Sequence, residues 1–138
     1  MFLLDSNVVS ELRSVKRCHP RLLAWQQEAP LESCWISVVT LLEIRKGIVQ
    51  VEGKDVEFAG VLERWLNERV KPTFAIRTLP VTLPVAERAG RIAAIRTRGL
   101  ADCLIAATAR EHRLALVTRN LADFEDLEGL EIVNPWDG

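Results

Sequence analysis

Short apolar runs and longer amphipathic segments alternate along this chain, and the alternation predicts the order of its elements. Runs of consecutive apolar residues at 2–4, 34–36, 114–117 and 132–133 are typical of short strands, and residues 76–79 are predicted to form another short strand. The segments between them repeat apolar residues every three or four positions, which is the spacing of one helix face. Strands separated by helices favour a parallel sheet that is covered on both faces. We therefore predict an α/β fold with three layers, α/β/α, around a central parallel sheet.

Residues that start and stop helices refine these boundaries. The turn formers at residues 5–7 suit the N-cap of a first helix. Pro72 is expected to end the long amphipathic helix that precedes this proline. Gly99 suits a helix C-cap, and Asp102 suits the cap of the next helix. The predicted helices span residues 8–13, 20–29, 37–48, 55–71, 84–97 and 103–112.

Length and charge limit the classes of protein that the chain can represent. Its 138 residues are 49% hydrophobic, which is enough for one compact domain spanning residues 1–138. The 18 Lys and Arg residues balance 19 Asp and Glu residues, so the net charge is -1. No global positive field then exists to hold nucleic acid, and any contact with nucleic acid must be local.

The cysteines and the N-terminal segment bear on the cellular compartment. Cys18, Cys34 and Cys103 are odd in number and lack the spacing of zinc ligands, which favours core thiols in a reducing compartment. The N-terminal segment has neither a basic leader nor a long apolar stretch. We expect a cytoplasmic protein with no membrane segment.

Four acidic residues lie at the joints between the predicted elements. Asp5 follows the first strand and Asp123 comes just after a late strand. Glu43 lies one turn into a helix, and Asp102 lies at a helix start. Ligands of open α/β sheets gather beyond the carboxyl ends of the strands, so these side chains are expected to converge. Converging carboxylates indicate a hard metal ion.

Each of these residues also has a purely structural explanation. Asp5 and Asp102 can cap helices, and Asn120 or Asp123 can form an Asx-type turn. Glu43 and the threonine three residues before it have the spacing of a capping box. These explanations do not account for why every joint carries an oxygen ligand in a chain that lacks other catalytic machinery.

Other catalytic motifs are missing from the sequence. It contains no GxGxxG after the first strand and no GxxxxGK[ST], so nucleotide binding loses its main support. No serine lies in a GxSxG motif, and His19 and His112 are the only histidines. A phosphoacceptor receiver domain is disfavoured because no lysine follows Lys71.

Four blocks of sequence together resemble the PIN-domain ribonucleases, specifically the VapC-type toxins. The blocks cover almost the whole chain in order: residues 3–11, 36–48, 102–109 and 116–124. The resemblance implies a PIN-like fold and an endoribonuclease, dependent on Mg²⁺ or Mn²⁺, that acts as the toxin of a toxin–antitoxin pair. It also implies a homodimer, an RNA substrate and a small antitoxin protein as partner.

The resemblance also implies roles for the acidic residues. Asp5, Glu43 and Asp102 match the three acidic ligands of that family by position. The fourth position stays open between Asn120 and Asp123, which lies one turn later. We expect Asp5 and Asp102 to bind the principal metal ion. Glu43 and the fourth residue are expected to hold a second ion or its waters.

Residues near these ligands are expected to support them. Thr118 is predicted to orient the ligand set by hydrogen bonding. Contacts to the RNA are expected from local basic residues, with single-stranded or looped RNA favoured over duplex. The candidates for these contacts are Arg13, Arg45, Lys46 and Arg119.

One departure from the family pattern keeps a second function open. Relatives tend to have several more residues before the central acidic residue, whereas here residues 98–101 lead directly into Asp102. That loop borders the expected site. The alternative function is therefore a catalytically weak or inactive PIN-like module that binds RNA or a protein partner.

Overall fold

The computed structural model describes residues 1–137, and a five-stranded parallel sheet lies at its centre. The strand order is β3-β2-β1-β4-β5, and every neighbouring pair is parallel. The predicted parallel sheet is therefore confirmed, with β1 in its middle. The strands are β1 (Phe2–Leu4), β2 (Cys34–Ser37), β3 (Thr78–Leu79), β4 (Ala115–Val117) and β5 (Ile132–Val133).

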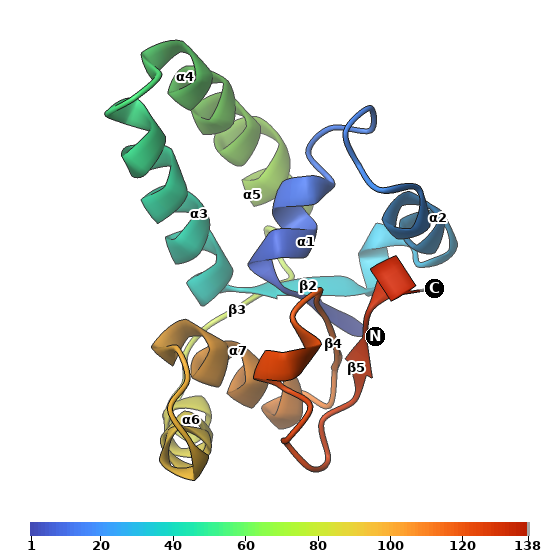
Figure 1. The fold of residues 1–138 in the computed structure, drawn as a ribbon, viewed down its shortest axis with the longest axis vertical. Coiled ribbons are helices and arrows are strands. Elements are labelled where there is room, and N and C mark those ends of the chain that lie inside the picture. Colours follow the sequence, from blue (N-terminus) through green and yellow to red (C-terminus); the bar gives the residue numbers. More distant parts are fainter. Residues whose placement is uncertain (138) are drawn as a thin grey trace.

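Helices cover both faces of the sheet and complete the three predicted layers (Figure 1). The α3–α4 hairpin projects away from the sheet on one side, and α6 and α7 pack together on the other. The first side holds α1 (Ser6–Glu11), α2 (Pro20–Glu28), α3 (Val38–Glu52) and α4 (Val56–Trp65). The second side holds α6 (Leu83–Ile95) and α7 (Leu100–Glu111). Shorter turns are η1 (Leu31–Ser33), η2 (Leu66–Val70), α5 (Lys71–Thr73), η3 (Leu121–Asp123) and η4 (Pro135–Asp137).

Neighbouring side chains of β1 belong to two different hydrophobic clusters, one on each face of the sheet. Leu3 and Leu4 are both buried, and they point to opposite faces as neighbours in a strand do. Leu4 belongs to the cluster formed with α1 to α4, and Leu3 belongs to the cluster formed with α6 and α7. Phe124 is fully buried in the second cluster and anchors the end of η3. The sheet is thus fixed from both sides directly beneath its carboxyl edge.

The predicted helix over residues 55–71 is interrupted, and the prediction that Pro72 ends it is wrong. α4 stops at Trp65, the π-helical turn η2 follows, and α5 continues through Thr73. Proline has no N–H to donate to the carbonyl four residues before it. The wider turn, in which the Lys71 N–H donates to the Leu66 carbonyl, lets the helical path pass through the proline.

The boundary between α6 and α7 also differs from the prediction. α6 ends well before Gly99 and α7 begins directly after it, so Gly99 is the N-cap of α7 and not a C-cap of α6. Asp102 lies in the first turn of α7 and does not cap it. The cause is tertiary, because the side chains of Arg96 and Arg98 bond to carbonyl groups in the segment after β4. No local sequence pattern encodes those contacts.

The cysteines agree with the prediction of core thiols. All three are free and buried. Burial raises the pKa of each thiol, which lowers the fraction of reactive thiolate. Within residues 1–137, no helix is long and apolar enough to cross a membrane.

Candidate active site

The acidic residues meet at the carboxyl edge of the sheet. Asp5 follows β1 directly, and Asp123 ends η3, the turn that comes after β4. Glu43 lies in the second turn of α3, and Asp102 lies in the first turn of α7. The starts of α1, α3 and α7 come together at this edge (Figure 1). Segments that are distant in sequence thus bring their carboxylates to the same edge of the sheet.

Asp5 is the most firmly held of these side chains and is only 4% exposed. Its Oδ1 accepts a hydrogen bond from the Ser6 N–H at 2.8 Å, so Asp5 is also the N-cap of α1. Its Oδ2 accepts a bond of 2.7 Å from the hydroxyl of Thr118, which is completely buried. The expected hydrogen bond from Thr118 therefore exists and points at Asp5. Capping and a place in the acidic cluster are compatible in this residue.

Glu43 does not form the capping box that its spacing permits. Ser37 is the N-cap of α3, and its hydroxyl accepts the Val39 N–H at 3.0 Å. Glu43 Oε1 accepts a hydrogen bond from the hydroxyl of Ser6 instead. Ser6 therefore links α1 to α3 inside the acidic cluster. Sequence reasoning missed this role, and the only available signal was the position of Ser6 next to Asp5.

The carboxylates act on one another through their charges. Burial raises the pKa of Asp102 to about 6, and the charges of Asp5, Asp123 and Glu43 contribute to the rise, while Arg98 opposes it. Burial also raises the pKa of Asp5, which the hydrogen bonds described above partly counteract. The charges of Glu43 and Asp123 raise the Asp5 pKa further. Such mutual repulsion favours the binding of a cation.

The two candidates for the fourth position, Asn120 and Asp123, have different surroundings in the structure. The charge of Asp123 acts on both Asp5 and Asp102. Asn120 is exposed, and its backbone N–H donates to the hydroxyl of Thr118 at 3.1 Å. Asp123 thus adds a carboxylate to the cluster, whereas Asn120 helps to fix Thr118.

Asn7 is a second neighbour that sequence reasoning did not single out. Its Nδ2 lies 3.4 Å from Asp5 Oδ2, at the long end of a hydrogen bond. Its Oδ1 is buried and has no hydrogen-bond partner in the part of the chain that the structure describes. A buried oxygen without a partner is unusual, and a water or a cation bound at Oδ1 would satisfy it.

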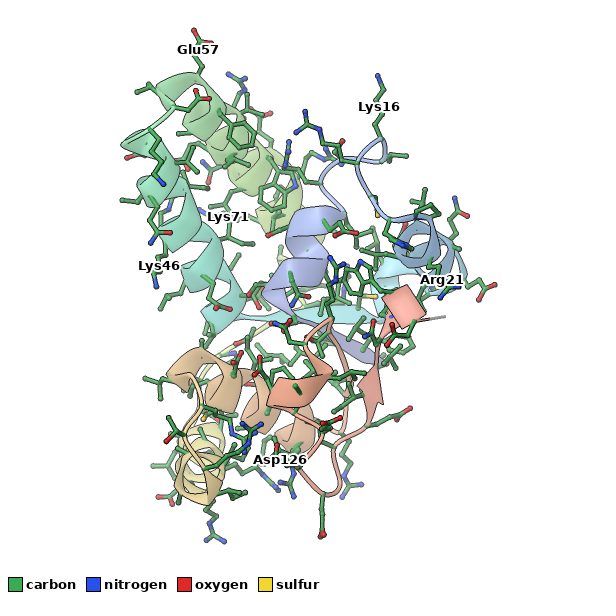
Figure 2. All side chains as sticks on the ribbon, viewed as in Figure 1. Lys16, Arg21, Lys46, Glu57, Lys71 and Asp126 are labelled. Carbon is green, nitrogen blue, oxygen red and sulfur yellow. The ribbon has the colours of Figure 1, made fainter. Side chains whose placement is uncertain are left out.

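The predicted basic residues occupy different environments. Arg13 lines a cleft of about 260 Å³ beside Ser6 and Glu43, with its guanidinium 5.4 Å from the ring centre of Phe58. Arg45 is bound to Glu63 at 2.6 Å. Lys46 is exposed on α3 and points away from α1 (Figure 2). Arg119 lines a hollow of about 660 Å³ together with Asn120 and Asp123. Arg13 and Arg119 therefore lie beside the acidic cluster, whereas Arg45 and Lys46 are directed elsewhere.

The donor set fits a hydrated divalent ion. Among residues 1–137, no group of three or more His, Cys, Asp or Glu side chains is arranged to hold a metal ion. Mg²⁺, however, is commonly bound by one or two carboxylates, with waters completing its shell. The donors present are all oxygen atoms, as hard cations prefer. Asn7 Oδ1 adds a neutral oxygen beside Asp5.

The chain is similar to known proteins over almost its whole length. The family model described as PIN domain matches residues 2–130. Toxin FitB of Neisseria gonorrhoeae is 36% identical to this chain over 143 residues, and the match covers 99% of both proteins. The VapC ribonuclease Y4jK of Sinorhizobium fredii is 34% identical over the same share of both proteins. The crystal structure of FitAcB from Neisseria gonorrhoeae matches with a TM-score of 0.86 at 33% identity, covering 99% of each chain.

Proposed function

This chain belongs to the PIN-domain family and, within it, to the VapC-type toxins, and on that premise we propose that it is the endoribonuclease of a toxin–antitoxin pair. It hydrolyses phosphodiester bonds of RNA with the help of a divalent metal ion held by carboxylates. The observation that carries this proposal is the electrostatic coupling at the carboxyl edge of the sheet. There burial raises the pKa of Asp102 to about 6, and the charges of Asp5, Asp123 and Glu43 contribute to the rise.

Asp5 and Asp102 are the proposed ligands of the principal ion, which is Mg²⁺ or Mn²⁺. Glu43 and Asp123 hold a second ion or its waters. Asp123 is preferred over Asn120 as the fourth residue because its charge acts on Asp5 and Asp102. A bound cation would offset this repulsion, since each carboxylate gains an attractive partner in place of a like charge.

The chain's own residues prepare the site for this chemistry. When bound, a divalent cation supplies charge that offsets the growing negative charge on the phosphoryl oxygens, and it lowers the pKa of the attacking water. Thr118 and the Ser6 N–H fix the orientation of Asp5. The Ser6 hydroxyl holds Glu43 against α1. These bonds set the carboxylates in place before substrate arrives, which reduces the reorganisation that catalysis requires.

Substrate contacts are assigned to the basic residues that border the cluster. Arg13 and Arg119 flank it from two sides, beside Glu43 and Asp123 respectively. Each can neutralise a phosphate on one side of the scissile bond. Arg45 is a weaker candidate because Glu63 already occupies its guanidinium. The net charge of -1 agrees with local contacts of this kind, which suit short or looped RNA segments.

A cleavage assay tests the proposal directly. The purified chain is incubated with unstructured RNA in Mg²⁺, in Mn²⁺ and in EDTA. We expect metal-dependent cleavage that falls roughly 100-fold or more in Asp5→Asn and in Asp102→Asn. Glu63→Gln is the matched control, because it replaces a carboxylate outside the cluster and should cleave like the parent. Cleavage that persists in Asp102→Asn would indicate a contaminating nuclease and would contradict the proposal.

The inactive binding module is the second candidate. Two observations favour it: the short loop before Asp102, and the absence, within residues 1–137, of three acidic or other metal-binding side chains grouped around one point. A chain that binds Mn²⁺ and RNA but does not cleave would support this function. Binding and cleavage are therefore measured on the same preparation.

The partners follow from membership of the toxin family. We propose a small antitoxin as the neutralising partner, a homodimer as the active assembly, and the cytoplasm as the compartment. Three free thiols are consistent with a reducing compartment. Size-exclusion chromatography with light scattering would measure the dimer, and a co-purifying small protein encoded beside the gene would identify the antitoxin.

A further inference from the structure

A buried arginine connects the loop before α7 to the segment that carries Asp123. The side chain of Arg98 is 1% exposed. Its Nη1 and Nη2 donate to the two carboxylate oxygens of Asp126 at 3.0 and 2.6 Å, which is the forked geometry of a strong arginine–carboxylate pair. Nη1 also donates to the backbone carbonyl of Asp123 at 2.7 Å. One side chain therefore reaches both the proposed fourth ligand and the residue three positions after it.

Arg96 reinforces this connection from the same loop. Its Nη2 donates to the carbonyl of Ala122 at 2.7 Å and to Asp126 Oδ1 at 3.2 Å. We call Arg96, Arg98 and Asp126 the latch. Asp126 lies on the side of the molecule that holds α6 and α7, away from the α3–α4 hairpin (Figure 2). The latch thus joins the α6–α7 loop to η3 on the face opposite to α3 and α4.

The contacts of the latch hold two segments of the chain in one geometry. Arg98 Nε is buried with no hydrogen-bond partner among the described residues. The Arg98 side chain is buried, whereas the side chain of Asp126 is 31% exposed, so desolvation of the guanidinium offsets part of the attraction in this pair. Such pairs are better suited to fixing one geometry among alternatives. Here the geometry that they fix is that of the loop before α7, which carries Asp102, relative to η3, which carries Asp123.

The two ends of the latch are close in sequence to Asp102 and Asp123. Arg98 lies four residues before Asp102, and the carbonyl that it binds is that of Asp123 itself. The connection between the end of α6 and the start of α7 consists of residues 96–99. This loop is tied by two hydrogen bonds to carbonyl groups of η3 and by three to the carboxylate of Asp126, all donated by Arg96 and Arg98.

We propose that the latch sets the separation of Asp102 and Asp123, so that Arg96, Arg98 and Asp126 are positioning residues for the metal-binding carboxylates. This inference rests on the proposed function, because it concerns the ligands of the same site. Residues that hold metal ligands in place typically change metal affinity or activity roughly 10- to 100-fold when they are replaced. The latch should therefore affect Mn²⁺ binding although none of its side chains is a proposed ligand.

The test compares Mn²⁺ affinity in full-length variants by titration calorimetry at one pH, with kcat and KM for RNA cleavage measured in parallel. Asp126→Asn should weaken Mn²⁺ binding by about tenfold or more and lower kcat more than it raises KM. Arg98→Lys keeps the charge but loses the forked contact, and it should weaken Mn²⁺ binding and lower kcat as Asp126→Asn does. Asp126→Glu restores a carboxylate and should recover part of the affinity. Arg96→Gln changes an exposed side chain and should give a smaller loss.

The matched control is Arg88→Gln, which breaks an ion pair with Glu111 that joins α6 to α7 and lies outside the latch. It should bind Mn²⁺ like the parent. Denaturation curves for every variant separate folding from metal binding. Parent-like Mn²⁺ affinity in folded Asp126→Asn and Arg98→Lys would overturn the latch proposal alone. A parent chain that binds no Mn²⁺ would overturn the proposed metal site, and the latch proposal with it.

Discussion

Replacing Asp102 by asparagine should stabilise the metal-free protein at neutral pH while it abolishes cleavage. Burial and the neighbouring carboxylates raise the pKa of Asp102 from 3.8 to about 6. A carboxyl group whose pKa is higher in the folded state contributes stability below its unfolded pKa, and that stability is lost as the pH rises through the folded pKa. The metal-free parent should therefore lose stability between about pH 4 and about pH 7. The asparagine side chain of the variant carries no charge at any of these pH values, so the variant should lack this part of the loss.

The size of the effect follows from the same pKa. A rise from 3.8 to about 6 corresponds to about 3 kcal/mol, at about 1.4 kcal/mol per pKa unit. Asp102 is only partly buried, so solvent screening reduces this value. Its place in the first turn of α7 also favours the charged form through the helix dipole, by about 0.3 to 1 kcal/mol. We expect Asp102→Asn to be about 1 to 2 kcal/mol more stable than the parent at about pH 7.5, with little difference at about pH 4.

Urea denaturation in EDTA across about pH 4 to 8 measures this difference, with Glu63→Gln as the control for loss of a carboxylate elsewhere. Adding Mn²⁺ should reverse the order, because only the parent gains binding free energy, about 2.7 kcal/mol at about 100 times Kd. A variant that is less stable than the parent at neutral pH in EDTA would refute the reasoning. A stability difference that does not change with pH would refute it as well.

Three further predictions concern the residues around the cluster. Thr118→Val removes the hydroxyl that donates to buried Asp5 and should destabilise the fold by about 1 to 3 kcal/mol. Urea denaturation measures this loss, and an unchanged midpoint would contradict the importance of that hydrogen bond. The guanidiniums of Arg98 and Arg96 hold the pKa of Asp126 far below its usual range, so the stability of the fold should fall as the pH drops below about 4. Thermal melts at a series of pH values should show a smaller fall of this kind in Asp126→Asn. If the melting temperatures of the parent and the variant fall equally at acid pH, the contacts of Asp126 with Arg98 and Arg96 are not the cause. Phe124→Ala should cost about 3 to 5 kcal/mol because the ring is fully buried, and a smaller loss by chemical denaturation would show that η3 is anchored elsewhere.

The sequence predicts the convergence of the acidic residues because convergence follows from topology. Once strands and helices alternate, the carboxyl ends of neighbouring parallel strands share one edge, and Asp5 and Asp123 must lie near it. Glu43 and Asp102 reach the same edge because α3 and α7 start there. The parallel sheet and the approximate positions of the main helices were predictable for the same reason, since apolar spacing reports which face of an element is buried.

The predictions that were wrong concern features that depend on contacts between distant segments of the chain. Gly99 has the residue type of a C-cap, yet α6 ends earlier because Arg96 and Arg98 bind the segment after β4. Pro72 has the residue type of a helix end, yet a π-helical turn carries the chain through it. Ser6 and Asn7 were missed as members of the cluster because small polar residues after a strand are ordinary turn formers. Only their partners, Glu43 and Asp5, distinguish them from such residues.

The central position of β1 makes assembly of the site a late event during synthesis. β1 is the earliest strand in the chain, and one of its edges pairs with β4, which is translated about a hundred residues later. Until β4 is made, that edge has no strand beside it and Asp5 has no Thr118. A nascent chain on the ribosome therefore lacks a complete acidic cluster. Nuclease activity would therefore appear only in molecules whose synthesis is nearly finished.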